Sequence, residues 1–460
     1  MSHSDDAMFT HAMWKADSRS QILDGLKHLS LYPLRGRVHK VLGPMLEATG
    51  LTCSVGYSCD IYCAEGHVLE AEVVGFRDDR TLLMPVGTTR GIAPGDSVAP
   101  RSTAPSIQVD EYLKGRILNG HGGAMDGKPL PAAGISYPLH GASLNPYDRY
   151  TIDSPMQLGV RMMDACLPMG WGQRLGLFAG AGVGKSMLMG MLARNSDADV
   201  NVIALVGERG REVREFLDIS LGAEALQRSV VVVATSDTPP VVRVRAALLA
   251  TTIAEGFRDK GKRVLLMMDS LTRFAQAQRE IGLMLGEPPA SKGYTPSCFT
   301  ALAELLERAG PGLKSASQRG DISGLYTVLV EGDDLSADPV ADSAMAILDG
   351  HAILERSLAQ QGHYPAINLQ RSISRLENQL SDPSVLNAAR SLRKELSLYE
   401  RMEDMIHMGA YEKGSNPELD RVIAHMPHIR AFLQQQPDEA CRREDALQLL
   451  RELVQAQVGQ

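Results

Sequence analysis

The chain has 460 residues, enough for two or three domains, and its 44% hydrophobic and 22% charged residues are typical of globular proteins. The 47 Lys and Arg against 55 Asp and Glu give a net charge of −8, which argues against a protein that mainly binds a nucleic-acid backbone. No run approaches the ~18 apolar residues of a membrane span, and the N-terminal residues lack the pattern of a signal peptide. We therefore expect a cytoplasmic protein.

Residues 1–30 are polar except for an apolar stripe at helical spacing, which consists of Ile22, Leu23, Leu26 and Leu29. We expect this amphipathic segment to be mobile unless it docks on a partner or a neighbouring subunit. From 31 to 104, short alternating stretches separated by turn sequences predict a small β-barrel domain. Aromatic and basic residues are scarce there, so an assembly collar is a better interpretation than a nucleic-acid module.

Three of the six cysteines lie close together in this region, namely Cys53, Cys59 and Cys63. They include no CxxC pair and have no partnering pair of histidines, and the surrounding residues alternate as in a strand. We interpret them as buried thiols rather than zinc ligands. Six cysteines in a chain of this length also do not form a disulfide framework.

From 105 to 378, apolar runs alternate with amphipathic stretches. This pattern predicts an α/β domain with a mostly parallel sheet covered by helices on both faces. The expected strands are 174–178, 200–206, 229–234, 263–268 and 325–330, and the expected helices are 185–196, 212–221, 241–260 and 273–286. Strands end after Arg375, and we expect a helical C-terminal domain over 379–460, with breaks at Gly414 and Pro427.

The strongest local motif is the sequence AGAGVGKS, which begins at Ala179, follows a predicted strand and opens a predicted helix. Its glycines allow backbone N–H groups to point at phosphate oxygens, and the helix N-terminus adds partial positive charge. Lys185 supplies a full charge for the β- and γ-phosphates, and Ser186 a hydroxyl ligand for Mg²⁺. The alternative, an ordinary glycine-rich turn, does not explain the Lys-Ser ending. The predicted nucleotide-binding residues are Ala179, Gly180, Ala181, Gly182, Val183, Gly184, Lys185, Ser186 and Met187.

Carboxylates at the ends of two further strands would complete a site for hydrolysis. Asp269 ends an apolar strand at the edge where open α/β sheets bind ligands, and we expect it to hold Mg²⁺, through water. Glu208 ends another strand and could orient or deprotonate the attacking water. The alternative for Glu208 is a surface carboxylate paired with Arg209 or Arg211. Glu212 could orient a metal-bound water instead.

The segment PAINLQRSIS from Pro365 to Ser374, followed by Arg375, fits P-x-I-N-x-x-x-S-x-S. This is the signature of the rotary ATP synthase α/β subunits and their relatives, and the GxGVGK[ST] and GERxRE sequences of that family occur here in the same order. Within the family the chain resembles the flagellar type III export ATPases, over nearly its whole length. The most specific matching segments begin at Gly207, Asp269, Gly286 and Tyr326.

The resemblance implies a RecA-like P-loop ATPase core between an N-terminal barrel and a C-terminal helical domain, assembled as a homohexamer with active sites between subunits. It implies that Glu208 activates water, with Arg209 also counted as catalytic, and that Arg375 reaches into the neighbouring site. Tyr364 resembles the aromatic residue that stacks on adenine, and Tyr411 could flank the same base. For both tyrosines a partly buried structural role is the alternative.

The resemblance further implies Mg²⁺-dependent ATP hydrolysis that energises or assists the export of flagellar proteins. The implied partners are export-apparatus proteins, regulator or stalk proteins, export chaperones and a membrane export gate at the cytoplasmic face of the inner membrane, with no nucleic acid. The alternatives are a virulence (injectisome) secretion ATPase, an RNA-translocating hexamer and a rotary ATP synthase subunit. The loop Gly182-Val-Gly and the sequence Ser372-Ile-Ser-Arg favour the flagellar reading, and Glu208 argues against a silent subunit.

Overall fold

The computed structural model describes residues 35–101, 103–330 and 335–458. The amphipathic stripe predicted within residues 1–30 lies outside these ranges. The chain separates into two compact units, residues 1–103 and 104–460. The predicted division between an ATPase domain and a helical domain at 378/379 lies inside the second unit and stays a prediction. None of the helices in the described ranges has the length and apolar character needed to cross a membrane.

The first unit is an antiparallel β-barrel. Within residues 35–101, six strands close in the order β1-β2-β5-β4-β3-β6. Alternate side chains point inward, so Leu46, Ile61 and Leu83 form part of its core. The β-barrel prediction is confirmed, and Cys59 and Cys63 are buried as expected, while Cys53 is half-buried. The strands are β1 (Gly36–Leu42), β2 (Met45–Thr49), β3 (Ser58–Tyr62), β4 (Val68–Arg77), β5 (Arg80–Pro85) and β6 (Ser97–Pro100).

The second unit is built on a mostly parallel sheet. In the described chain its strands follow the order β19-β18-β12-β17-β15-β13-β14-β8, with β16 paired to β17. All the pairs from β18 to β8 are parallel, whereas β19 is antiparallel to β18. The strands are β8 (Arg116–Asn119), β12 (Arg174–Ala179), β13 (Val200–Glu208), β14 (Ser229–Thr235), β15 (Arg263–Asp269), β16 (Gly310–Pro311), β17 (Asp321–Leu329), β18 (Gly350–Leu354) and β19 (Ile367–Ser374).

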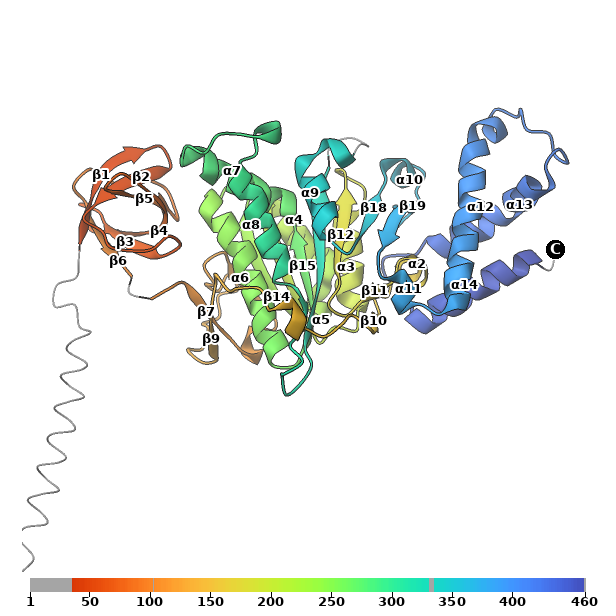
Figure 1. Ribbon diagram of the computed structural model, residues 1–460, viewed down its shortest axis with the longest axis horizontal. Coiled ribbons are helices and arrows are strands. Elements are labelled where there is room, and N and C mark those ends of the chain that lie inside the picture. Colours follow the sequence, from red (N-terminus) through yellow and green to blue (C-terminus); the bar gives the residue numbers. More distant parts are fainter. Residues whose placement is uncertain (1–34, 102, 331–334, 459–460) are drawn as a thin grey trace, which may run out of the picture. The chain divides into compact units, whose positions relative to one another are not determined.

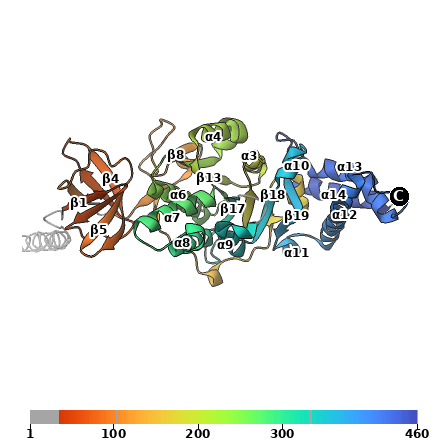
Figure 2. The same cartoon turned by 90° about the horizontal axis from the view of Figure 1, so that it is seen from above.

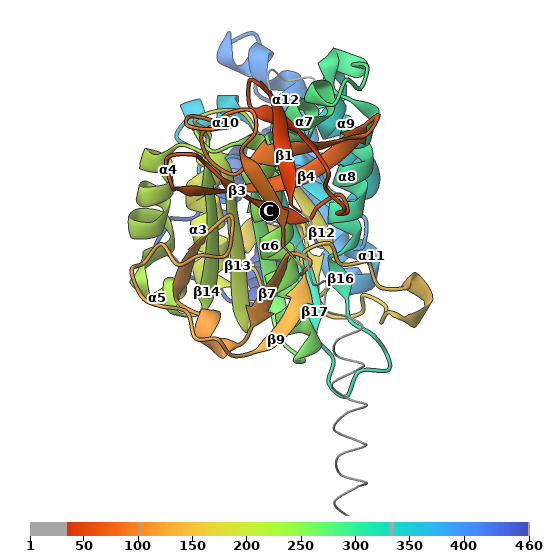
Figure 3. The same cartoon turned by 90° about the vertical axis from the view of Figure 1, so that its left-hand side faces the viewer.

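Helices cover both faces of this sheet, as predicted. Helix α6 packs on β13, β14 and β15 and against α7, whereas α4 and α5 contact β14 from the other side. Figures 2 and 3 show α3 and α4 on one side of the sheet and α7, α8 and α9 on the other. The helices are α2 (Arg161–Cys166), α3 (Lys185–Asn195), α4 (Gly210–Glu215), the π-helical turn η3 (Phe216–Leu221), α5 (Gly222–Gln227), α6 (Pro240–Asp259), α7 (Leu271–Met284), α8 (Pro296–Glu307), α9 (Pro339–Ile347), α10 (Arg356–Gln360) and α11 (Glu377–Leu380).

Shorter elements connect the longer strands and helices of this unit. Strands β7 (Ser106–Val109) and β9 (Ile135–Pro138) form an antiparallel pair, and β10 (Pro155–Met156) pairs with β11 (Met169–Gly170). Both β7 and β9 pack against α6. The remaining described elements are the 3₁₀ turns η1 (Glu111–Leu113), η2 (Pro146–Asp148), η4 (Ser291–Gly293) and η5 (Leu335–Ala337).

Helices follow β19 to the end of the described chain, namely α12 (Pro383–His407), α13 (Pro417–Leu433) and α14 (Arg443–Val458) (Figure 1). They pack on one another and on α2, and α12 also contacts β19. The predicted break near Gly414 is confirmed, since it separates α12 from α13. The predicted break at Pro427 is wrong, because Pro427 lies inside α13. Buried Met426 and Ile429 beside the proline stabilise a continuous helix despite the lost backbone hydrogen bond.

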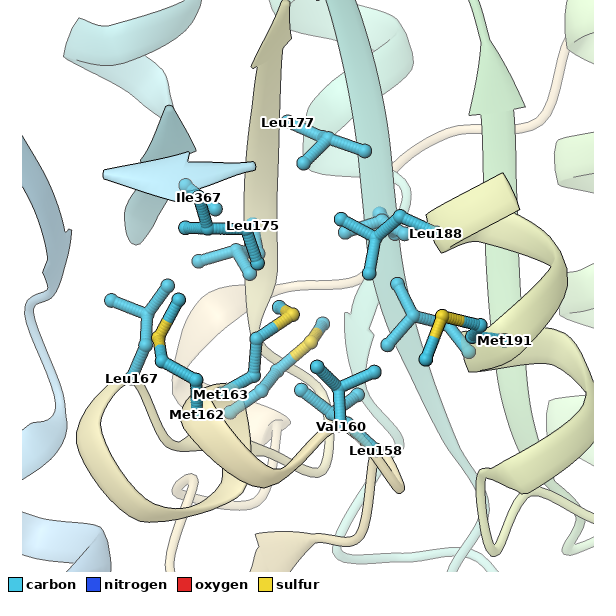
Figure 4. Packing of buried hydrophobic residues seen from close by; sticks show 14 of the residues in the cluster. Leu158, Val160, Met162, Met163, Leu167, Leu175, Leu177, Leu188, Met191 and Ile367 are labelled. Carbon is cyan, nitrogen blue, oxygen red and sulfur yellow. The ribbon is translucent and has the colours of Figure 1, made fainter. Parts of the chain in front are cut away.

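One apolar cluster connects α2, β12, α3 and the C-terminal helices. Figure 4 shows its central part, in which side chains of α2 and the preceding loop meet those of β12 and α3. The labelled residues are Leu158, Val160, Met162, Met163, Leu167, Leu175, Leu177, Leu188, Met191 and Ile367. Because β12 and α3 flank the glycine-rich loop, this packing fixes the loop on both sides.

The observed elements differ from the expected ones where a strand is buried on one face only, or where local pairing sets the first residue of an element. Strands β8, β18 and β19 were not expected, and β19 alternates buried and accessible residues instead of forming a continuous apolar run. Strand β17 begins at Asp321, before the expected start, because residues 321–324 pair with residues 263–266 of β15. The helix expected over 212–221 begins at Gly210 and becomes the π-helical turn at Phe216.

Candidate active site

The glycine-rich loop joins the end of β12 to the start of α3. Gly182 and Gly184 have φ angles of +77° and +86°, in the left-handed region that favours glycine. A Cβ atom on Gly184 would lie 3.3 Å from ring carbons of Tyr364. A glycine is therefore required at position 184 for two reasons: the backbone there has a positive φ angle, and the Tyr364 ring leaves little room for a side chain.

Lys185 lies between two carboxylates. Its Nζ is 2.5 Å from Asp269 Oδ1 and 3.7 Å from Glu208 Oε1. Burial alone would lower the pKa of Lys185, but the charges of Asp269 and Glu208 raise it above its usual value. Asp269 also accepts a hydrogen bond of 2.6 Å from the Thr327 hydroxyl. The predicted phosphate-binding cation is thus held charged, at the carboxyl ends of three neighbouring strands.

Glu208 ends β13 and is oriented by its neighbours. A Cβ on the preceding Gly207 would lie 2.8 Å from Arg273 Cβ, so the glycine lets α7 approach this strand end closely. Burial, the Asp269 charge and contact with Glu212 raise the pKa of Glu208 to about 7, although Lys185 opposes the shift. Glu208 Oε1 is buried without a hydrogen-bond partner among the described residues. A carboxyl whose pKa lies near neutrality and whose Oε1 accepts no hydrogen bond suits a general base.

A cavity of about 480 Å³ brings most of the predicted catalytic groups together. The glycine-rich loop lines it on one side, and Glu208, Arg209 and Glu212 line it on the other. Arg209 and Glu212 pair with each other at 3.3 Å, and the Arg209 side chain is largely exposed. The alternative pairing of Glu208 with Arg209 or Arg211 is not what the structure shows, since Arg211 pairs with Glu215.

Arg273, which the sequence analysis did not single out, also lines this cavity. It lies one helical turn after Ser270, whose hydroxyl caps the start of α7. Its guanidinium donates a 3.0 Å hydrogen bond to Gln276. The sequence could have indicated Arg273 by its position, because it lies three residues after Ser270, the helix cap that directly follows Asp269.

Arg375 lies at the other end of the strands from the glycine-rich loop. Ser374 pairs with Gly350, the first residue of β18, whereas the last residue, Leu354, pairs with Ala179 of β12. Four residue steps of β18 separate these two rows, about 13 Å along the strands. Arg375 is exposed and donates a 3.0 Å hydrogen bond to the Met345 carbonyl. The structure therefore does not bring Arg375 to the loop of its own chain.

The two tyrosines differ in position. The Tyr364 ring packs beside Gly184, and 44% of the residue is exposed, which leaves ring surface available to a ligand. The Tyr411 hydroxyl lies 3.0 Å from both Asp420 Oδ1 and the Asn416 carbonyl oxygen, and its single proton is shared between these two acceptors. These contacts anchor Tyr411 in the loop before α13. Neither tyrosine is among the described residues that line the cavity of about 480 Å³ beside the loop, and only Tyr364 contacts the loop itself, at Gly184.

A strand, a glycine-rich loop and a helix that opens with Lys185-Ser186, with acids at the ends of neighbouring strands, define a P-loop nucleoside triphosphatase. Comparisons with known proteins place the chain more closely. The ATP synthase alpha/beta family nucleotide-binding domain matches residues 159–374, the beta-barrel domain of that family matches 38–101, and the T3SS EscN ATPase C-terminal domain matches 381–452.

Curated relatives agree over nearly the full length. The chain is 47% identical over 435 residues to the flagellum-specific ATP synthase of Bacillus subtilis. The aligned region covers 94% of this chain and 98% of that relative. The chain is also 46% identical over 416 residues to the type 3 secretion system ATPase of Xanthomonas euvesicatoria, at 90% and 93% coverage. The structure of the assembled ATPase EscN from enteropathogenic E. coli has a TM-score of 0.84 at 39% identity, and covers 91% of this chain and 100% of that chain.

The chain therefore belongs to the ATP synthase alpha/beta family, in the branch of the flagellum-specific ATP synthases and type III secretion ATPases. It is an ATPase with a RecA-like core, an N-terminal barrel and C-terminal helices, as the sequence predicted.

The raised pKa of Glu208 predicts how the free protein responds to pH. Because the folded pKa of about 7 lies above the ordinary 4.5, any stability that the protonated carboxyl contributes is fully present below pH 4.5 and is lost as pH rises through 7. Glu208→Gln removes this titration. We expect its melting temperature to rise relative to the unchanged protein between pH 5 and pH 8, measured by scanning fluorimetry without nucleotide. A difference that stays constant across this range would contradict the assignment.

Proposed function

We propose that this ATPase hydrolyses Mg·ATP at sites shared between the subunits of a homohexamer and thereby energises or assists the export of flagellar proteins through a type III apparatus. The observation that carries the proposal is the position of Lys185, which lies beside the glycine-rich loop and between Asp269 and Glu208. An incoming triphosphate offers this ammonium group stronger partners than the two carboxylates, so binding would release Glu208 to interact with water.

Oxygen ligands suited to Mg²⁺ lie around this point. The Ser186 hydroxyl and the Glu212 carboxylate line the cavity, and Asp269 lies next to Lys185. We assign Ser186 to direct contact with the metal ion and Asp269 and Glu212 to the waters around it. When bound, Mg²⁺ neutralises charge on the β- and γ-phosphates.

Arg375 would complete the site of a neighbouring subunit. It is exposed at the strand end opposite to its own glycine-rich loop, so a ring of identical subunits is the arrangement that gives it a phosphate to contact. The solved relative EscN is described as an assembled ATPase. We propose that this chain assembles in the same way and that the hexamer is the active form.

Tyr364 is proposed to stack on the adenine base, because its exposed ring adjoins Gly184 and the start of α3. Tyr411 stays a weaker proposal, since its hydroxyl is used within its own loop. Arg209 is proposed to contact the phosphates once its pairing with Glu212 is exchanged for the ligand.

The partners follow from the relatives. EscN has also been solved in complex with its central stalk, EscO, with a TM-score of 0.83 to this chain. We propose a stalk-like partner here, together with export chaperones and peripheral association with a membrane export gate at the cytoplasmic face. Flagellum-specific relatives reach 48% identity against 46% for the type 3 secretion relative, which makes the injectisome the second candidate.

The proposed function is tested by ATP hydrolysis and by secretion. Lys185→Ala removes the cation that holds the triphosphate, and we expect loss of both ATP binding and Mg²⁺-dependent phosphate release. The matched control is Lys413→Ala, an exposed lysine in the loop between α12 and α13. In a flagellated cell that lacks the endogenous protein, the control should restore secretion of filament protein and Lys185→Ala should not. Normal ATP hydrolysis by Lys185→Ala would contradict the site.

A further inference from the structure

The segment after α13 is bound to the backbone of Tyr364. Gln435, only 4% exposed, donates its backbone N–H to the Tyr364 carbonyl at 3.0 Å. These residues lie 71 positions apart, one in the C-terminal helical region and the other before β19. The backbone of Tyr364, whose exposed ring is the proposed surface for the base, is therefore held by a distant part of the chain.

The side chain of Gln435 is fully engaged in holding this segment in place. Its Oε1 accepts a 2.7 Å hydrogen bond from the Arg161 backbone N–H, at the first residue of α2. Its Nε2 donates to the Gly159 carbonyl at 2.9 Å and to the Glu439 carbonyl at 2.8 Å. A buried amide with every polar atom paired admits one orientation, so the Gln435 backbone is fixed against the start of α2.

A second set of contacts holds the same junction. The Arg161 guanidinium donates to the Ala431 carbonyl at 3.0 Å and to the Gln434 carbonyl at 3.3 Å. The end of α13 is thus tied to α2 by backbone and side-chain hydrogen bonds on both sides of Gln435. Helix α2 belongs to the same apolar cluster as β12 and α3, which flank the glycine-rich loop (Figure 4).

We infer that Gln435 is a positioning residue for nucleotide binding, which holds the Tyr364 ring against Gly184 so that the exposed surface of the ring can stack on one base. This inference rests on the proposed role of Tyr364 in stacking on adenine. Gln435 does not touch the nucleotide and acts through the Tyr364 carbonyl. As a consequence, the affinity of the ATPase for the base depends on how the C-terminal helices dock on α2.

The test compares steady-state kinetics of the full-length protein in Gln435→Ala, Gln435→Glu and Tyr364→Ala, with Gln436→Ala as the control. Gln436 is exposed next to Gln435, and Gln435→Glu keeps the acceptor for Arg161 N–H while losing both donated bonds. Loss of one or more hydrogen bonds of ordinary strength predicts a rise of about 3- to 10-fold in KM for ATP in the Gln435 variants, with kcat within about twofold. Inorganic tripolyphosphate, which has no base, is measured in parallel as a competitive inhibitor.

The inference predicts an unchanged inhibition constant for tripolyphosphate and a double variant, Gln435→Ala with Tyr364→Ala, no weaker than Tyr364→Ala alone. An unchanged KM in both Gln435 variants, or a parallel loss of tripolyphosphate binding, would overturn it. A normal KM in Tyr364→Ala would instead remove the proposed base site on which it rests. The Gln435→Glu variant keeps the test open if Gln435→Ala fails to fold.

Discussion

Replacing Arg375 with alanine should lower ATP turnover by about 10³- to 10⁵-fold, the effect of an arginine that stabilises the transferring phosphoryl group. The guanidinium would act on the neighbouring subunit, because its own strand carries it away from its own glycine-rich loop. Binding of Mg·ATP should change little, since the loop and Lys185 are intact. Single-turnover and steady-state phosphate release, with binding measured by a fluorescent ATP analogue, check both expectations.

Two further variants sharpen this test. Arg375→Lys keeps the charge but loses the planar fork, and we expect it to recover only a small part of the activity. Arg390→Ala is the matched control, because Arg390 is an exposed arginine of α12 whose guanidinium contacts Asn378. Wild-type turnover in Arg375→Ala would remove Arg375 from the catalytic machinery.

Replacing Glu208 with glutamine should lower turnover by about 10²-fold or more while ATP still binds, since a general base typically contributes that much. The pKa of Glu208, raised to about 7, adds a second expectation. The kcat/KM of the unchanged protein should rise with pH through about 7, as the carboxyl of the free enzyme loses its proton. This acid limb should be missing from the residual activity of Glu208→Gln.

Glu224→Gln is the control for this substitution, because Glu224 is an exposed carboxylate of α5. It should retain both the turnover and the pH profile of the unchanged protein. If Glu208→Gln hydrolyses ATP normally, another residue positions the attacking water. If its turnover falls but the acid limb persists, the titrating base is not Glu208.

The parts of the site that follow from local sequence were predictable. The glycine-rich loop, Lys185 and Ser186 occupy one continuous stretch whose spacing is dictated by the phosphates. Glu208 and Asp269 end apolar strands, and parallel strands place their carboxyl ends at one edge. Each of these positions follows from the spacing of apolar residues and from the order of the motifs along the chain, and both can be read directly from the sequence.

The parts that depend on pairing between distant segments were not predictable from the residues alone. The position of Arg375 follows from the antiparallel register of β19 on β18, and an edge strand with alternating burial gives no strong apolar signal. Gln435 lies in a polar run of three glutamines, and nothing local distinguishes it from Gln434 and Gln436. Pro427 is tolerated inside α13 because tertiary packing outweighs local preference.

The most direct test of the shared active site mixes two inactive proteins, Arg375→Ala and Glu208→Gln, and measures ATP hydrolysis. In mixed rings, roughly a quarter of the interfaces would combine the intact Glu208 of one subunit with the intact Arg375 of its neighbour. We expect the mixture to regain activity well above that of either protein alone, and this activity to fall on dilution. A mixture that stays as inactive as its components, while the two proteins demonstrably assemble together, would contradict the shared active site.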